Sequence, residues 1–477
     1  MSGKRSAKRA KKARAISYKR TVSGVNEQGK TSGGKVGQMS AKSYRVNEDA
    51  ASKEHRAGSG KAAPAGRINI GSVNVSYITL IAFIALMASY TFLLFELFKN
   101  QAFHTDYLVY GSDVDAYLLE MQGIDSGFDF PYPVYFLLGK FFALFSNVNM
   151  GAALSATVLN SLSPVFLSYF MLRELSVHVS LKSKNRTAYE GFILLVTFSV
   201  FFVSMLYAPE GYYIPGIPLR NLGVYSANPY YNQTYLAARG FAIVAFFLFA
   251  HILTYYEKHT DIKEYVAFSV FLLLATLTKP SFTLVLVSAA AVHMIVKLIM
   301  SRGKNLKGFI NLLLTAVPTF ITLMIQFGGV FGADSHAGSE GGIGIGIGKA
   351  WHVYTNNIVI AVMLACAFPG LMMLLNFKRF RDHAVFRLSW EIMMAGFLEF
   401  LLLYEKGDRF THNNFAWGYM YGILFVFISG TLLLIENTVR KKQAFPALVL
   451  EWCVYLMHLV CGVAFFKMLY LGGYFYV

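Results

Sequence analysis

The stretch YITLIAFIALMASYTFLLFELF, residues 77–98, decides the fold class of this chain. It holds 22 residues with a single charge, Glu96, and a helix needs about 20 mostly apolar residues to cross a bilayer. It begins some 75 residues into the chain, too far for a cleavable signal peptide, so we expect an uncleaved membrane anchor. The 477 residues are 55% apolar and 14% charged, against about 25% charged in a soluble domain. The pattern predicts an all-α polytopic membrane protein.

Further apolar runs follow along the chain, and we predict eleven spans in all. The segment 132–147 is shorter and contains Pro133 and Lys140, so we interpret it as a helix lying on the outer surface. The predicted spans are residues 77–98, 149–173, 190–207, 233–255, 264–280, 284–300, 308–330, 355–376, 386–404, 417–436 and 446–470.

The placement of Lys and Arg predicts the topology. With 132–147 outside the count of spans, the connections rich in Lys and Arg all fall on one side, which the positive-inside tendency assigns to the cytoplasm. The N-terminus is then cytoplasmic, the C-terminus is extracytoplasmic, and the protein is a multi-pass protein of the cell membrane. Four outer loops result, at residues 99–148, 208–231, 331–354 and 405–416.

The formal charge of +17 is concentrated at the N-terminus. Residues 1–67 hold 17 Lys and Arg against 4 Asp and Glu, and large apolar residues are few there. We therefore predict a disordered, basic cytoplasmic tail over residues 1–75 and a membrane domain over residues 76–477. Anionic lipid headgroups suit such a tail as partners. Tyr18 and Tyr44 are the aromatic residues among residues 1–67, too few for the interleaved stacking residues of a nucleic-acid arm.

The first outer loop is acidic and aromatic over residues 104–139, with six Asp and Glu and no Lys or Arg between Asp106 and Asp129. Asp113 and Asp115 are the candidates for a general base that removes a proton from an acceptor hydroxyl. In the structural alternative, Ser112 caps a short helix and Asp115 completes a capping box. On a helix these two carboxylates point about 200° apart, which argues against a shared metal, although a divalent metal stays open as a cofactor.

The second outer loop, EGYYIPGIPLRNLGVYSANPYYNQTY, contains polar and aromatic side chains suited to a sugar, and Arg239 follows it inside a predicted span. A charge at the centre of a span costs about 2.5–3.5 kcal/mol on insertion scales. Arg239 therefore either reaches back to the outer surface or binds an anionic headgroup. The candidate binding residues are Arg220, Asn228, Tyr231, Asn232 and Arg239.

Two later segments offer cations. Lys279 precedes Pro280, which breaks the helix, so it can pair with phosphate or simply end a span. The loop EKGDRFTHNNFAWGY combines charged and amide groups suited to phosphate and sugar recognition. An ordinary polar turn before an interfacial Trp would contain most of the same residues. Its candidates are Glu405, Arg409, His412 and Asn413. We interpret the glycine-rich residues 331–350 as a mobile loop over the site.

Taken in order, these motifs resemble the GT-C superfamily of integral-membrane glycosyltransferases. The resemblance covers residues 77–470 and rests on the acidic first loop, the Pro-Tyr-Pro helix start, NPYYNQTYLAARGF, TKPSF and GDRFTHNNFAWGY. It implies a polyprenyl-phosphate sugar as donor and a glycan, lipid or protein acceptor. It also implies that a first-loop carboxylate, Asp113 with Asp115 or Asp106 as substitutes, is the base. Relatives often carry adjacent acids there, whereas this chain has Asp-Val-Asp, which leaves the choice between Asp113 and Asp115 open.

A transporter or flippase for a lipid-linked saccharide is the alternative function. It would use Arg239 and Lys279 as pathway residues but needs no acidic outer loop. We therefore expect an enzyme of the cell envelope that works at its outer face.

Overall fold

The computed structural model describes residues 67–104, 109–178, 185–206, 221–332, 335–336 and 341–474. The chain divides into two compact units, residues 1–74 and 75–477. In the first, strand β1 (Arg67–Ile70) pairs with the start of β2 (Val73–Ser76), and Arg67 donates to the Asn74 side chain at 2.5 Å. The predicted disorder of residues 1–75 is therefore wrong for its last residues, and the part before residue 67 lies outside the described residues.

The second unit is built of helices, and the chain is a multi-pass membrane protein. Seven helices are long and apolar enough to cross a membrane, or eight if the bent pair α11–α12 counts as one span, among the described residues. In chain order the long elements are α2 (Tyr77–Phe103), α5 (Val148–His178), α6 (Arg186–Ser199), α8 (Gln233–Tyr255), α9 (Ile262–Thr278), α10 (Ser281–Met300), α11 (Leu306–Thr315), α12 (Val317–Phe331), α13 (Ile358–Phe380), α14 (Ala384–Leu402), α15 (Ala416–Arg440) and α16 (Phe445–Tyr470).

Short elements connect these helices. They are α3 (Val114–Gln122), α4 (Pro133–Ala143), η1 (Val200–Phe202), α7 (Asn221–Val224), β3 (Ile343–Ile345), η2 (Trp351–Val353), β4 (Leu403–Glu405) and η3 (Gly407–His412). Helix α4 coincides with the segment predicted to lie on the surface. It is apolar but has only 11 residues, too few to span a bilayer.

Each of the eleven predicted spans coincides with a helix or, for residues 308–330, with the bent pair. The seven helices that meet the length and composition of a span are α2, α5, α8, α10, α13, α15 and α16. Helices α6 and α9, with 14 and 17 residues, and the more polar α14 account for the rest. A count of seven or eight therefore rests on helix length and composition, and eleven stays a prediction.

Helices α8 and α15 form the centre of the unit. Nearly all of their side chains are buried, and they pack through rings, as in the stacked pair Phe246 and Phe425 with centroids 4.3 Å apart. Helix α14 approaches α15 closely because glycines face each other there: a Cβ on Gly396 would lie 2.8 Å from the Gly418 carbonyl oxygen. Small residues at such crossings are how membrane helices maximise their packing.

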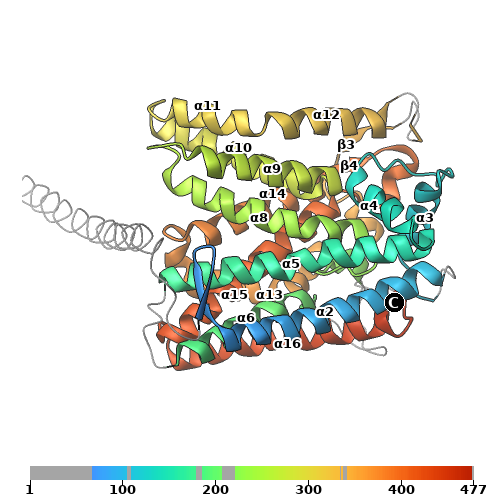
Figure 1. Ribbon diagram of the computed structural model, residues 1–477. Coiled ribbons are helices and arrows are strands. Elements are labelled where there is room, and N and C mark those ends of the chain that lie inside the picture. The colour runs from blue at the N-terminus through green and yellow to red at the C-terminus, as the bar shows by residue number, and fades with distance from the viewer. Residues whose placement is uncertain are drawn as a thin grey trace, which may run out of the picture. The chain divides into compact units, whose positions relative to one another are not determined.

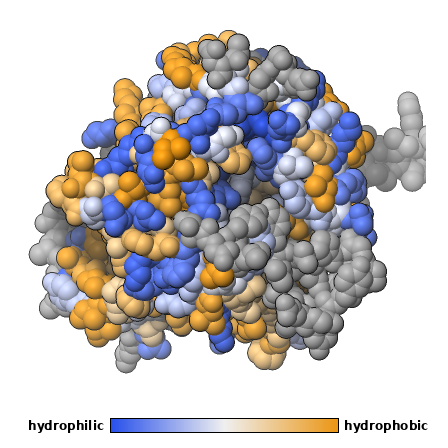
Figure 2. All heavy atoms as spheres, turned by 90° about the vertical axis from the view of Figure 1, so that its right-hand side faces the viewer, coloured by the Kyte–Doolittle hydropathy of each residue, from blue (hydrophilic) through white to orange (hydrophobic). Residues whose placement is uncertain are grey.

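The four predicted outer loops meet at one end of this unit. Asp113 N–H donates to the Tyr231 carbonyl at 3.0 Å, the Trp351 indole donates to the Gly223 carbonyl at 2.7 Å, and β3 pairs with β4. Figure 1 shows α3, β3 and β4 at the same end of the long helices. Figure 2 views this end, where hydrophilic residues lie across the face with hydrophobic ones around them. Tyr110 N–H donates to the Gly472 carbonyl, so the end of α16 lies here too, and its extracytoplasmic side stays a prediction.

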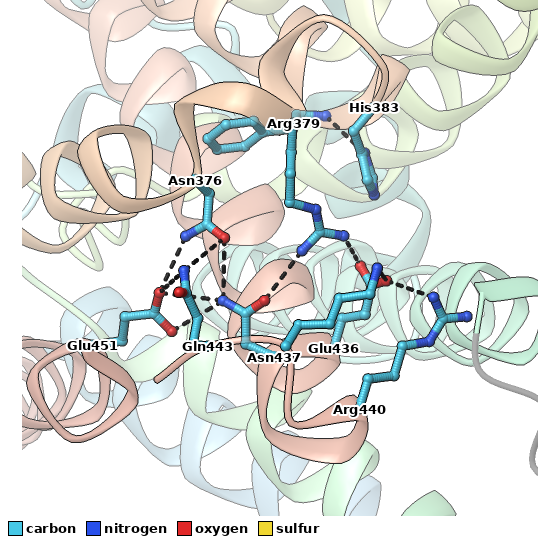
Figure 3. A network of polar contacts seen from close by, with 10 residues as sticks. Asn376, Arg379, His383, Glu436, Asn437, Arg440, Gln443 and Glu451 are labelled. Atoms are coloured by element: carbon cyan, nitrogen blue, oxygen red, sulfur yellow. Dashed lines mark hydrogen bonds and ion pairs between the residues drawn. The ribbon is translucent and has the colours of Figure 1, made fainter. Parts of the chain in front are cut away.

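The opposite end is tied by a polar network (Figure 3). Glu436 pairs with Arg379, with Arg440 at 3.0 Å and with Lys442 at 2.9 Å. The fully buried Glu451 accepts hydrogen bonds at 3.1–3.2 Å from the carboxamides of Asn376, Asn437 and Gln443. Basic residues thus gather at the end predicted to be cytoplasmic, where Arg379 links α13 to α15 through Glu436. The carboxamides of Asn376 and Asn437 link both helices to Glu451 of α16.

Candidate functional site

Asp113 stands at the start of α3, and its backbone N–H donates to the Tyr231 carbonyl of the second loop. It occupies the N-cap position, but its side chain makes no capping bond. The hydroxyl of Ser112, one residue earlier, accepts instead from the Val114 N–H at 3.4 Å, so Ser112 does contact the start of the helix, as predicted. Helix α3 ends at Gly123, whose φ of +73° is the left-handed conformation that glycine adopts easily. The carboxylate is left free to face the second loop rather than its own helix.

Asn232 receives that carboxylate. As the N-cap of α8, its Oδ1 accepts from the Tyr235 N–H at 2.8 Å, which fixes the side chain. Its Nδ2 then donates to Asp113 Oδ2 and, at 3.0 Å, to the Tyr117 hydroxyl. One amide therefore joins the first loop to the start of α8.

Lys279 approaches the same amide from the break between α9 and α10. Its Nζ donates to Asn232 Oδ1 at 3.2 Å and to Thr234 Oγ1 at 3.1 Å. The ammonium lies 4.4 Å from the Trp417 ring centroid and 5.8 Å from that of Tyr132. With 6% exposure, it is a buried cation held by neutral oxygens and aromatic faces.

The electrostatics of the first loop favour a basic carboxylate. Burial raises the pKa of Asp113, and the Lys279 charge and the Asn232 hydrogen bond offset only part of this rise. Burial also raises the pKa of Asp115, whose Oδ1 is buried without a hydrogen-bond partner among the described residues. The same residues contain no group of three or more His, Cys, Asp or Glu that could hold a metal.

A second charged cluster follows β4. Glu405 accepts from Arg409 Nε at 3.3 Å and from Asn414 Nδ2 at 2.6 Å, and burial raises the pKa of Glu405 while Arg409 lowers it. Burial raises the pKa of Tyr132, the Asp113 carboxylate raises it further and the Arg409 guanidinium lowers it. The Lys279 ammonium lies 5.8 Å from the Tyr132 ring centroid, so Tyr132 borders the cluster around Asn232.

Asn413 and His412 border the second cluster without joining it. Asn413 has a φ of +51° and donates through Nδ2 to the Tyr225 hydroxyl at 2.9 Å, while its Oδ1 is buried without a partner in the described part of the chain. The His412 ring lies 5.2 Å from the Phe128 centroid. His412 thus packs on the first loop.

Arg239 and Asn228 form a separate, internal cluster. The guanidinium is fully buried and donates to Asn228 Oδ1, to Asn160 Oδ1 at 2.5 Å and to the Tyr90 hydroxyl at 3.0 Å. No carboxylate pairs with it among the described residues, and the Phe201 ring lies 4.7 Å away. Arg239 therefore does not reach back to the surface, and its predicted role in phosphate binding stays untested.

The remaining predicted residues divide into one that contributes to the site and two that cannot be placed. Tyr231 supplies the carbonyl that fixes Asp113 and packs its ring 6.1 Å from that of Trp417. Asp106 and Arg220 lie outside the described residues. The list of candidate site residues omitted five residues that contribute here: Tyr117, Tyr132, Thr234, Asn414 and Trp417. Tyr117 follows Asp113 by four residues, a spacing that places two side chains on one helix face, so the sequence did carry that signal.

Comparison with known proteins adds no relative. No protein-family model matches the chain, and no curated protein matches it significantly.

Proposed function

We propose that this protein transfers a sugar from a polyprenyl-phosphate donor to an acceptor hydroxyl at the outer membrane face, as its resemblance to GT-C glycosyltransferases suggests. One observation carries the proposal: Asp113 and Lys279, a carboxylate and a buried ammonium, bind the same amide of Asn232. This pairing lies at the end of a membrane unit where the loops meet. A lipid-linked donor presents its phosphate and sugar at that level.

In the proposed reaction Asp113 takes the proton from the acceptor hydroxyl as its oxygen bonds to the anomeric carbon. The bond from that carbon to the phosphate oxygen breaks, and the phosphate leaves with the electron pair. Burial raises the pKa of Asp113, which makes its carboxylate a stronger base near neutral pH. Lys279 and Arg409 would stabilise the negative charge that grows on the leaving phosphate.

The acceptor and donor would approach from different loops. Glu405 accepts from both Arg409 and Asn414, and the Trp417 ring lies against Lys279. Aromatic faces and amides of this kind suit a sugar ring and its hydroxyls. The alternative of a transporter would use Arg239 and Lys279 as pathway residues, and it does not require the acidic first loop.

The test is transfer by the purified protein in lipid nanodiscs, with a panel of polyprenyl-phosphate sugars and release of polyprenyl phosphate as readout. General-base catalysis contributes about 10²–10⁴-fold, so Asp113→Asn should lower the rate by that factor. Asp125→Asn is the matched control, because it makes the same charge change at an exposed position of the same loop. Equal rates for wild type and Asp113→Asn would remove Asp113 from the mechanism.

Lys279→Gln tests the cation separately. Loss of one donor that stabilises developing negative charge costs about 10²–10³-fold in rate. Lys140→Gln, an exposed lysine on α4, should leave the rate unchanged. If no donor in the panel is consumed by the wild-type protein, the proposed function itself fails.

A further inference from the structure

The segment GGIGIGIGKA, residues 341–350, alternates glycine with isoleucine. In an extended strand, alternate residues face opposite sides, so within β3 (Ile343–Ile345) the two isoleucines fall on one face and Gly344 on the other. Ile347 follows in a turn. Strand β3 pairs antiparallel with β4, Gly344 opposite Tyr404. The pairing continues as Gly346 N–H donates to the Leu402 carbonyl at 2.8 Å. The segment therefore runs along the end of α14.

The glycine face is covered and needs glycine. A Cβ on Gly344 would lie 2.4 Å from the Tyr404 ring, and one on Gly346 would lie 2.9 Å from the Lys349 side chain. Lys349 in turn places its Nζ 4.8 Å from the Tyr404 ring centroid. Tyr404 and Lys349 thus cover the glycine side of the strand.

The isoleucine face is open. Ile345 is 81% exposed and Ile347 is 77% exposed, although isoleucine is among the residues most often buried. Nothing in the described part of the chain covers them. Two large aliphatic side chains so fully exposed to water would be unusual in so short a segment.

This apolar face continues the outer surface of a candidate span. A Cβ on Gly348 would lie 2.9 Å from Ile358 Cδ1, and Ile358 is the first residue of α13. Val359 and Met363, one turn apart on α13, are 69% and 64% exposed, as expected of a lipid-facing stripe. The isoleucines therefore stand at the level where α13 enters the membrane.

We propose that Ile345 and Ile347 insert into the acyl chains of the adjacent leaflet and seat this strand on the membrane surface. The occupant of the open face is then lipid. Lys349 and Tyr404, a cation and an amphipathic ring, suit the headgroup level beside it.

Backbone chemistry sets the depth of insertion. Gly342, Gly344 and Gly346 direct their backbone N–H and C=O groups toward β4. The backbone N–H and C=O groups of the isoleucines between them therefore point to the open edge of a two-stranded sheet. Open sheet edges do not occur within the hydrocarbon core, because their polar groups would find no partner there. The backbone must therefore remain among headgroups and water while the side chains alone reach the acyl chains.

The test places nitroxide spin labels at Ile345→Cys and Ile347→Cys in nanodiscs and compares collision with oxygen, which concentrates in lipid, and with a water-soluble nickel chelate. The background replaces Cys366, Cys453 and Cys461, the free cysteines of the described residues, after its elution volume and circular dichroism are shown to be unchanged. Val359→Cys serves as the lipid reference and Asp408→Cys, which is exposed in η3, as the water reference.

We expect oxygen collision to exceed nickel collision at both isoleucine positions, with a smaller depth than at Val359. Nickel-dominated collision, as at Asp408, would place the strand in water and overturn the proposal. Little collision with either reagent would mean that protein covers the face, and a depth beyond Val359 would overturn the interfacial position. The measurement requires no sugar transfer, so its result is independent of the proposed function.

Discussion

Replacing Asn232 by serine is the sharpest perturbation of the candidate site. Serine is as good an N-cap as asparagine, so helix α8 keeps its first turn. The shorter side chain loses the donor that reaches Asp113 and Tyr117. The variant thus separates the role of this residue in the helix from its role in the site.

The expected magnitude follows from the lost hydrogen bond. A hydrogen bond to a charged group is worth about 1.5–3 kcal/mol, and one pKa unit corresponds to about 1.4 kcal/mol. Burial already raises the pKa of Asp113, and the Asn232 donor lowers it. Without that donor the pKa should rise by a further 1–2 units or so.

The assay is the pH dependence of sugar transfer. The base must be ionised, so the rate falls on the acid side as Asp113 is protonated, and this limb should move to higher pH by about 1–2 units in Asn232→Ser. At a pH below the pKa of Asp113 in both proteins, the variant should be about ten- to a hundredfold slower than the wild type. Asn232→Asp, which sets a second carboxylate against Asp113, should move the limb further in the same direction.

Asn311→Ser is the matched control, because Asn311 is half-buried and donates to the Thr260 hydroxyl at 3.0 Å, away from the residues of the site. Its limb should coincide with that of the wild type. An acid limb that does not move in Asn232→Ser, with transfer intact, would refute the assignment of Asp113 as the titrating base.

Three further predictions concern stability and pH. Arg239→Met should lower thermal stability strongly, by about 1–3 kcal/mol for each buried oxygen left without its donor, as measured by thermal unfolding in nanodiscs; unchanged unfolding would show that these bonds contribute nothing. Gly422→Ala should destabilise by about 1–3 kcal/mol, because its Cβ would lie 2.8 Å from Met393 Cα, whereas Gly370→Ala, with open space around it, should not. The exposed His336 bonds Asp125 and Asp129 at 2.8 and 2.9 Å. These bonds raise the pKa of His336. The Gly127 backbone N–H lowers the pKa of Asp125, and the His336 hydrogen bond lowers it further. The contact should therefore persist from mildly acidic to neutral pH. It should weaken as pH rises through the raised pKa of the histidine, or falls through the lowered pKa of the aspartate. Hydrogen exchange of residues 125–129 measures this, and equal protection at pH about 6 and about 9 would contradict it.

Length and hydropathy sufficed to place the helices, because a span must satisfy every backbone group within itself and must bridge a fixed thickness. Each predicted span coincides with helix for this reason. The bend of 49° between α11 and α12 was not foreseen, since no glycine or charge marks it and only Pro318 stands near. The predicted loop over residues 331–350 was also too simple, because Gly344 and its neighbours pair with β4.

The site could be predicted only in part. Asp113, Asn232 and Lys279 were each selected for their chemistry, but their meeting depends on how three loops fold, which no local pattern encodes. Arg239 shows the limit most clearly. It follows Asn232 by seven residues, almost two full turns, so it lies on the same helix face about 10 Å deeper. At that depth Tyr90 and Asn160 close over it, and the sequence gives no sign of their approach.

The indirect link between Asp113 and Lys279 is itself an argument for chemistry rather than stability. The two groups form no direct ion pair within the described residues, and each binds the Asn232 amide instead. A direct pair at 4 Å would be worth about 4 kcal/mol at an effective dielectric constant of 20, and it would lower the pKa of the acid. Here the effect of burial on the pKa of Asp113 exceeds that of the Lys279 charge, and the pKa rises. Because the amide holds the charges apart, the carboxylate stays basic and the ammonium keeps its capacity to meet a phosphate.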